Sequence, residues 1–103
     1  MAKRHQNFEF HPEAMIEAKE SAEWYAERSP TAAIDFKREL RFVEKLVVEH
    51  PGSWSPYLHG TRCLKLKRFP YGLVYVERGD RIVGIAVAHL RRRPGYWRKR
   101  LAD

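Results

Sequence analysis

The chain has 103 residues, of which 44% are hydrophobic and 13% aromatic; this predicts one compact domain over residues 1–103 and excludes an intrinsically disordered chain. The net charge of +7 is uneven, because residues 1–61 contain 8 Lys and Arg against 10 Asp and Glu, whereas residues 62–103 contain 12 against 3. Such a basic second half favours a polyanion or an acidic protein segment as partner.

A single cysteine, Cys63, excludes an internal disulfide, and no Cys or His spacing is typical of a zinc site. We therefore expect a reducing cytoplasmic location, with neither metal nor cofactor. The start "MAKRHQNFEF" lacks the apolar run of a signal peptide, and no apolar run elsewhere is long enough to span a bilayer, so no membrane contact is expected.

The first elements are a short strand at Phe8 and Phe10 and a helix over 12–28, which Pro12 opens. The buried stripe of this helix is predicted at three- and four-residue spacing: Met15, Ala18, Ala22 and Tyr25. Its polar side is predicted to carry Glu13, Glu17, Glu20 and Glu27.

A second helix is predicted from Pro30, capped by Ser29, to about His50, before the helix-ending pair Pro51 and Gly52. The connection is so short that the two helices must form an antiparallel hairpin. The predicted buried face consists of Ala33, Phe36, Leu40, Val43 and Val47.

After the loop "GSWSPYLHG" hydrophobic residues recur at every second position, which is typical of a strand. In "RCLKLKRF" Leu64 and Leu66 share one face of a strand, and Lys65 and Lys67 share the other with Cys63. Strands over 73–77 and 81–89 follow, joined by a hairpin turn at "RGD". The fold class is therefore α+β: an N-terminal strand and an antiparallel helical hairpin packed on one face of a mainly antiparallel four-stranded sheet. The other face would carry Lys65 and Lys67, with His89 as a further candidate.

The element order, together with "HPEA", "RFPYGLVY" and "AHLRRRPGYWRKR", resembles the RelE/ParE superfamily of bacterial type II toxins, which includes plasmid stabilisation proteins. The resemblance covers nearly the whole chain. It implies a cytoplasmic toxin that a cognate antitoxin wraps and blocks. One branch of the superfamily cuts messenger RNA on the ribosome, and the other inhibits DNA gyrase without hydrolysing nucleic acid.

RNA cleavage through the 2′-hydroxyl needs a base, cations around the phosphate and an acid for the leaving oxygen. Lys65 and Lys67 match basic positions of the ribonuclease branch, Arg92 and Tyr96 lie near its C-terminal basic and tyrosine positions, and His89 can carry a proton near neutral pH. Two departures oppose this chemistry: Cys63 stands where that branch often has lysine, and Gly72 where it often has a catalytic arginine. The catalytic candidates are Lys65, Lys67, His89, Arg92 and Tyr96.

Arginine forks suit phosphates and antitoxin carboxylates equally well. The nucleic-acid-binding candidates are Arg62, Arg68, Arg91, Arg93, Arg98 and Arg100. Structural roles stand beside these assignments: the two lysines can be a solvated strand face, His89 can bond the C-terminal segment, and the residues from Pro94 to Trp97 can close the sheet edge.

The sequence slightly favours a ribosome-dependent endoribonuclease, with ribosome and messenger RNA as partners. The alternatives are a ParE-like gyrase inhibitor without hydrolytic activity, or a non-toxic RNA-binding module.

Overall fold

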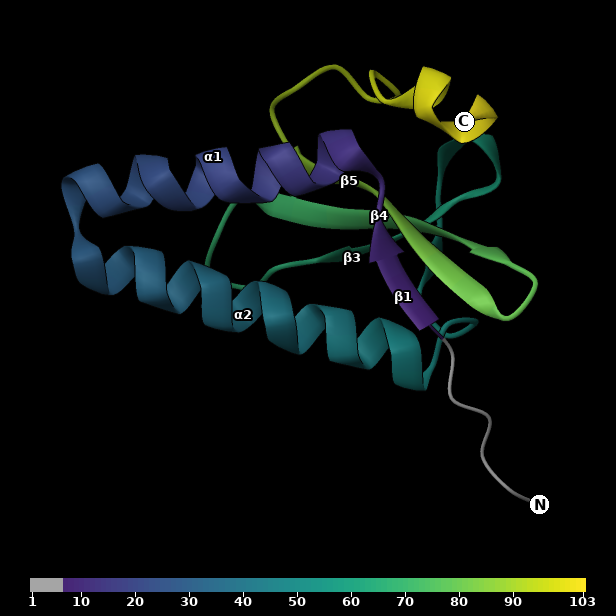
Figure 1. Ribbon diagram of the computed structural model, residues 1–103, viewed down its shortest axis with the longest axis horizontal. Helices are drawn as coiled ribbons and strands as arrows, with labels where there is room; N and C mark the ends of the chain where they lie inside the picture. The colour runs from purple at the N-terminus through teal and green to yellow at the C-terminus, as the bar shows by residue number, and fades with distance from the viewer. Residues whose placement is uncertain (1–6) are drawn as a thin grey trace.

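The computed structural model describes residues 7–103; Met1–Gln6, which belong to the segment considered above for a signal peptide, lie outside the described residues. Helix α1 (Pro12–Arg28) and helix α2 (Pro30–Glu49) form the predicted antiparallel hairpin (Figure 1). Ser29 ends α1 and caps α2, since its hydroxyl accepts the Ala32 N–H at 3.2 Å. Both helices are confirmed, and α2 ends one residue earlier than expected. No helix within residues 7–103 is long and apolar enough to cross a membrane.

Within residues 7–103 the sheet has five strands, in the order β1-β5-β4-β3-β2. They are β1 (Asn7–Phe10), β2 (Ser55–Pro56), β3 (Arg62–Lys65), β4 (Tyr71–Arg78) and β5 (Arg81–His89). Among these described strands, β1 alone runs parallel to its neighbour, which is β5. The α+β fold class is confirmed. The strand count exceeds the prediction because Ser55 and Pro56, inside the predicted loop, pair with the start of β3. Short 3-10 turns follow at Leu58–Gly60 and Arg98–Ala102.

The helical hairpin covers one face of the sheet, called here the helix face. All five residues predicted to be buried in α2 are buried, and Phe36 packs with Tyr25, Phe69 and Tyr71 at ring-centroid distances of 5.2–5.4 Å. The stripe predicted for α1 is partly wrong, because Met15 is 57% exposed. The inward stripe starts one residue earlier, at Ala14, and continues through Glu17, Ala18, Ser21, Ala22 and Tyr25.

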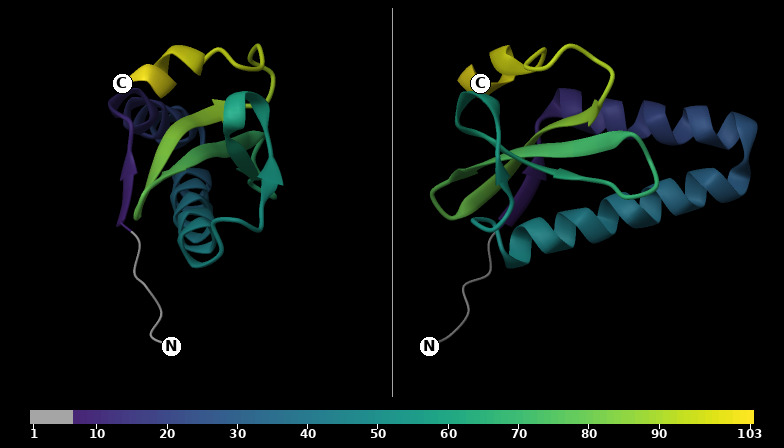
Figure 2. Two further views of the ribbon diagram at one scale, coloured as in Figure 1. Left: turned by 90° about the vertical axis from the view of Figure 1, so that its right-hand side faces the viewer. Right: turned by 180° about the vertical axis from the view of Figure 1, so that it is seen from behind.

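The opposite face of the sheet, called here the second face, has its own core. Val74, Val83, Ile85, Ala86 and Ala88 pack there with Trp97, which is only 1% exposed. A bulge in the pairing of β4 with β5 leaves Ile85 without a register partner, so Ile85 and Ala86 both join this core. Trp97 belongs to the C-terminal segment, residues 90–103. This segment and α2 lie on opposite sides of the sheet (Figure 2). The prediction that these residues close only the sheet edge is therefore too limited.

The turn between β4 and β5 is the predicted hairpin: Arg78 pairs with Arg81, and Gly79 has φ +64°. The "RGD" tripeptide thus has a conformational role at this position, since a positive φ favours glycine.

Candidate functional site

The C-terminal segment is held on α1 and β5 by Glu17. Its carboxylate accepts two parallel bonds from the Arg100 guanidinium, both at 2.9 Å, and one from the Tyr96 hydroxyl at 2.7 Å. The Val87 backbone N–H donates at 3.0 Å, and an Arg92 guanidinium nitrogen lies 3.4 Å away. Glu17 is 12% and Arg100 14% exposed, so this is a largely buried, charge-assisted network. We call Glu17, Arg92, Tyr96 and Arg100 the Glu17 cluster.

This cluster also completes the outer edge of β5. β1 pairs with β5 only as far as Gly84, whose carbonyl accepts the His11 N–H at 2.9 Å. Beyond that point Arg100 donates to the Ile85 carbonyl at 3.0 Å, and the Val87 N–H donates to Glu17. Side chains therefore satisfy backbone groups that a sixth strand would otherwise pair.

Tyr96 and Arg92 are occupied by these contacts. The Arg92 guanidinium stacks 3.6 Å above the centre of the Tyr96 ring. Burial, followed by the hydrogen bond to Glu17, raises the pKa of Tyr96. Both the engaged hydroxyl and the raised pKa oppose proton donation from Tyr96 to a substrate at neutral pH.

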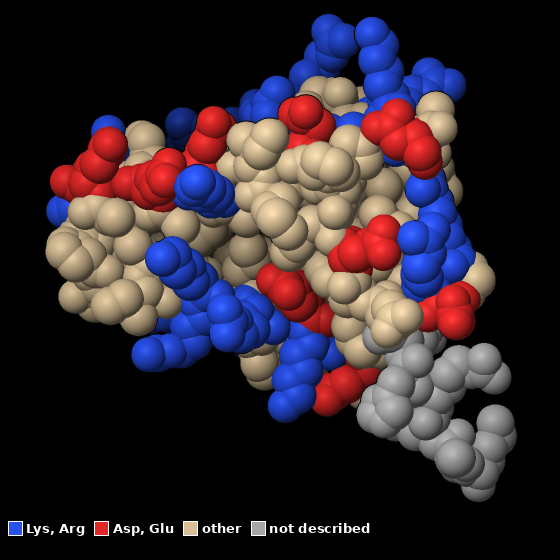
Figure 3. All heavy atoms as spheres, in the orientation of Figure 1, with Lys and Arg blue, Asp and Glu red and all other residues tan. Residues whose placement is uncertain are grey.

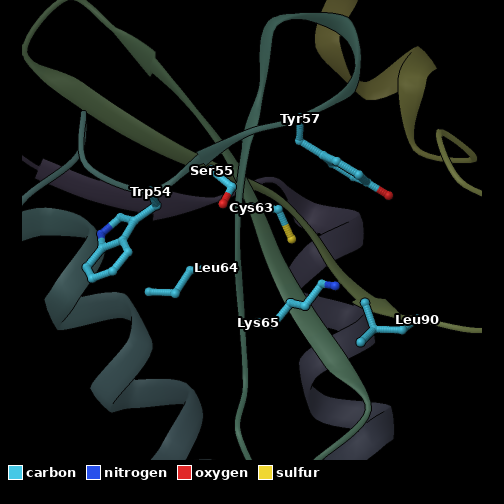
Figure 4. Close-up of a pocket in the computed structure, with 7 residues that line it drawn as sticks. All are labelled: Trp54, Ser55, Tyr57, Cys63, Leu64, Lys65 and Leu90. Carbon is cyan, nitrogen blue, oxygen red and sulfur yellow. The ribbon is translucent and has the colours of Figure 1, made fainter.

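Lys65 lies at the end of β3 on the second face, where it is exposed. Figure 4 shows Cys63 and Lys65 pointing to one side of the strand and Leu64 to the other. Together with Trp54, Ser55, Tyr57 and Leu90 they line a hollow of about 550 Å³. Burial raises the pKa of the Cys63 thiol, and Lys65 opposes that effect, so Cys63 is not an activated nucleophile.

Gly72 and Cys63, the two departures from the ribonuclease pattern, are in contact. Gly72 pairs with Lys65 across β3 and β4, and a Cβ atom built on it would stand 2.7 Å from the Cys63 sulfur. The thiol therefore occupies the space that the Cβ atom of any other residue at position 72 would need. The two departures from the ribonuclease pattern are therefore not independent, because Cys63 and Gly72 pack directly against each other.

His89 is not on the face that carries Lys65, and that expectation is corrected. It pairs with Tyr71 in the sheet, and the two rings meet edge to face on the helix face at 5.0 Å. Its Nδ1 accepts the Arg91 backbone N–H at 3.1 Å, which places the proton of the neutral ring on Nε2. The alternation Val87, Ala88, His89 explains the placement, since Val87 belongs to the helix-face core.

Lys67 is also separated from Lys65, because β3 ends at Lys65 and the chain bends toward α2. The backbone N–H groups of Lys67 and Arg68 donate to Glu39, and the Arg68 guanidinium approaches Asp35 at 3.6 Å. These residues line a hollow of about 370 Å³ with Arg38 and Phe42. The prediction that Lys65 and Lys67 project side by side is wrong.

The six arginines predicted to bind nucleic acid fall into two groups. Arg62 donates to the Trp54 carbonyl at 2.7 Å, Arg68 is paired with α2, and Arg100 is paired with Glu17. Arg91, Arg93 and Arg98 are exposed, and none of them forms an ion pair within residues 7–103. Of these six arginines, the three that remain available to a ligand therefore lie in the C-terminal segment.

Glu17 is the site residue that sequence reasoning missed, since it was assigned to the polar side of its helix. A signal exists in the stripe: position 17 follows Ala14 by three and precedes Ser21 by four, so a stripe started at Ala14 includes it. Its partner Arg100 lies 83 residues away, and no local pattern links the two.

Comparison with known proteins identifies the family. Residues 8–94 match the model of the ParE toxin of the type II toxin-antitoxin system parDE. Among solved structures, a chain of the chromosomal ParDE system from P. aeruginosa is similar in fold, with a TM-score of 0.74 and 18% identity over 84% of this chain and 98% of that chain. Comparison with curated proteins gives no match. The resemblance to RelE/ParE toxins is confirmed, and the chain belongs to the ParE toxin family of type II toxin-antitoxin systems.

Proposed function

We propose that this toxin inhibits DNA gyrase by binding and does not cut RNA. Its membership of the ParE family carries the proposal, because inhibition of gyrase is the usual activity of that family. A toxin of this class implies a cognate antitoxin as partner. Action on gyrase would place the toxin in the cytoplasm, where the chromosome is.

The positions of the catalytic candidates support a non-hydrolytic mode. In-line cleavage needs the base, the acid and the cations around a single phosphate. Lys65 and His89 lie on opposite faces of the sheet, and Lys67 lies against α2.

The remaining candidates support the same mode. The Tyr96 hydroxyl and the Arg92 guanidinium both contact Glu17. Gly72 supplies no side chain to replace the missing arginine. A bidentate phosphate donor is therefore absent at the position where the ribonuclease branch often has one.

A supercoiling assay tests the proposal. Purified toxin should inhibit the supercoiling of relaxed plasmid by gyrase in a concentration-dependent manner, and added antitoxin should restore it. Messenger RNA in a translation extract should stay intact at the same toxin concentration. For Lys65→Ala and His89→Ala, the toxin concentration that halves supercoiling should stay within about twofold of that of the original protein.

The opposite pattern would contradict the proposal. If messenger RNA is cut at ribosome-occupied positions, the cuts disappear with Lys65→Ala, and supercoiling is unaffected, the chain is a ribosome-dependent endoribonuclease. If neither process responds, the chain is a binding module without toxicity.

A further inference from the structure

A basic hollow lies on the C-terminal segment, beyond the Glu17 cluster. It measures about 630 Å³ and is lined by Arg92, Arg93, Gly95, Tyr96, Arg98 and Lys99, with no Asp or Glu among the lining residues. Figure 3 shows Lys and Arg atoms projecting along the edge of the molecule where this segment runs. We call it the C-terminal hollow.

The backbone brings these cations together. Gly95 has φ +80°, and tight turns flank it: the Tyr96 N–H donates to the Arg93 carbonyl at 3.2 Å, and the Arg98 N–H to the Gly95 carbonyl at 3.0 Å. The chain therefore reverses between Arg93 and Arg98, so that cations from before and after the turn line the same hollow.

The residues at the base of the hollow are held in place by contacts with the rest of the fold. Tyr96 is bonded to Glu17, and the Trp97 ring is buried in the second-face core beside Tyr57 and His59, at centroid distances of 6.0 and 5.9 Å. Arg92 is held against the Tyr96 ring. A ligand would therefore meet cations whose backbone is already ordered, which lowers the entropic cost of binding.

Three of the lining cations have no acidic partner. Arg93, Arg98 and Lys99 are exposed and form no ion pair within the described part of the chain, in contrast to Arg68 and Arg100, which pair with Asp35 and Glu17. Unpaired cations around an open hollow repel one another, and a multivalent anion relieves that repulsion.

We infer that the C-terminal hollow binds the phosphate backbone of duplex DNA. The inference rests on the proposed function, since gyrase holds duplex DNA that a bound toxin would then contact beside the enzyme. The lining has no aliphatic side chain on which an amphipathic acidic peptide could pack. The hollow beside Phe42, by contrast, combines an exposed apolar ring with charges of both signs.

The expected signature is the dependence of affinity on salt. The three unpaired lining cations predict a slope of log K against log salt of about −2.7, which corresponds to a loss of about 40-fold in affinity between 50 and 200 mM salt. The triple variant Arg93→Ala, Arg98→Ala, Lys99→Ala keeps Arg92 and the Glu17 cluster. Its predicted slope is close to zero, so its affinity should change by less than about twofold over the same range.

The experiment measures binding of the full chain to a 30-base-pair fluorescent DNA duplex by anisotropy, without gyrase. The matched control removes three exposed cations of α2 by Lys37→Ala, Arg41→Ala and Lys45→Ala, and should retain the steep slope. Circular dichroism checks that both variants are folded. Duplex RNA of the same sequence and poly-glutamate serve as competitors at equal charge.

Several outcomes would overturn the inference. An equal loss of slope in the control would show a net-charge effect without a defined site. More effective competition by duplex RNA or poly-glutamate would assign the hollow to RNA or to an acidic protein segment. Because the assay contains no gyrase, its failure leaves the supercoiling test intact, and a failed supercoiling test leaves the binding result intact.

Discussion

At the residue scale, Glu17 connects three separate parts of the chain: helix α1, the edge of β5 and the C-terminal segment. Burying a carboxylate is costly unless it is paired and hydrogen-bonded, and here Arg100 supplies the fork geometry that compensates. Removing one member of such a pair leaves the other charge buried without a partner.

Glu17→Gln should therefore lower the free energy of unfolding by about 3 kcal/mol, since Arg100 would lose its counter-charge. Urea denaturation followed by circular dichroism measures the change. Glu20→Gln, at an exposed position of the same helix, is the control and should stay within about 0.5 kcal/mol of the original chain. Equal losses in the two variants would show that the Glu17 cluster contributes nothing specific.

Gly72 and Cys63 provide a second test at this scale. Gly72→Ala places a methyl group 2.7 Å from the Cys63 sulfur, so overpacking should cost about 1–3 kcal/mol. In a Cys63→Ala background the sulfur is absent, and the same change should cost less than about 1 kcal/mol.

A double-mutant cycle measured by urea denaturation reports the coupling between these two positions. Gly52→Ala, where no atom lies within 4 Å of the new methyl group, should be nearly neutral. A coupling energy near zero would contradict direct packing of Cys63 on Gly72.

At the element scale, the C-terminal segment belongs to the second core of the protein. Trp97 is buried against β4 and β5, and Arg78 holds the end of the segment by donating to the Leu101 carbonyl at 2.7 Å. The segment lies largely beyond residues 8–94, which the family model matches, so this core includes a part of the chain outside the match.

Trp97→Ala should cost about 3–5 kcal/mol, because it leaves a large cavity in the second-face core. Trp24→Ala is the matched control: Trp24 is 49% exposed, and its loss should cost less than about 1 kcal/mol. Thermal unfolding of the two variants measures the difference. Similar midpoints would mean that the C-terminal segment is not part of the core.

Sequence periodicity was sufficient for the helices and for β5, because α2 places its apolar residues at regular helical spacing and Ser29 with Pro30 fixes the boundary. Periodicity gave the wrong buried stripe for α1, where the buried positions hold small residues such as Ala14. The larger Met15 suggested a stripe displaced by one residue. Periodicity also failed at Lys67. The alternation of apolar and polar residues continues past the end of β3, whereas the chain bends there toward Glu39. Contacts that join distant parts of the chain have no local signal.

At the scale of the whole molecule, the basic second half of the sequence is not one continuous basic face. Arg81 pairs with Glu9, Arg68 with Asp35, and Arg100 with Glu17, so acids of the first half neutralise some of these cations. Three of the cations that remain unpaired, Arg93, Arg98 and Lys99, line the C-terminal hollow.

Three tyrosines in different parts of the fold couple its stability to alkaline pH. Burial raises the pKa of Tyr25 and of Tyr96, and it raises the pKa of Tyr75 to about 12. A raised pKa in the folded state means that folding favours the protonated phenol. This stabilisation is complete below about pH 10, the usual pKa of tyrosine, and is lost as the pH rises toward 12.

The free energy of unfolding, measured in urea at intervals from pH 9 to pH 11.5, should therefore fall as the pH rises. Tyr75→Phe should make that fall shallower, because it removes one of the contributing phenols. Tyr57→Phe, at an exposed tyrosine, is the control. An unchanged pH profile for Tyr75→Phe would show that ionisation of Tyr75 does not limit alkaline stability.

The side chains that complete the outer edge of β5 also affect how copies of this protein meet one another. An open strand edge is a template on which a second chain can add a strand, and such pairing leads to aggregation or domain swapping. Glu17 and Arg100 occupy this edge beyond Gly84 with charged groups. A chain that lost this arrangement would expose both its second core and an unpaired strand, so the contacts that hold the C-terminal segment also oppose pairing of this edge with another copy.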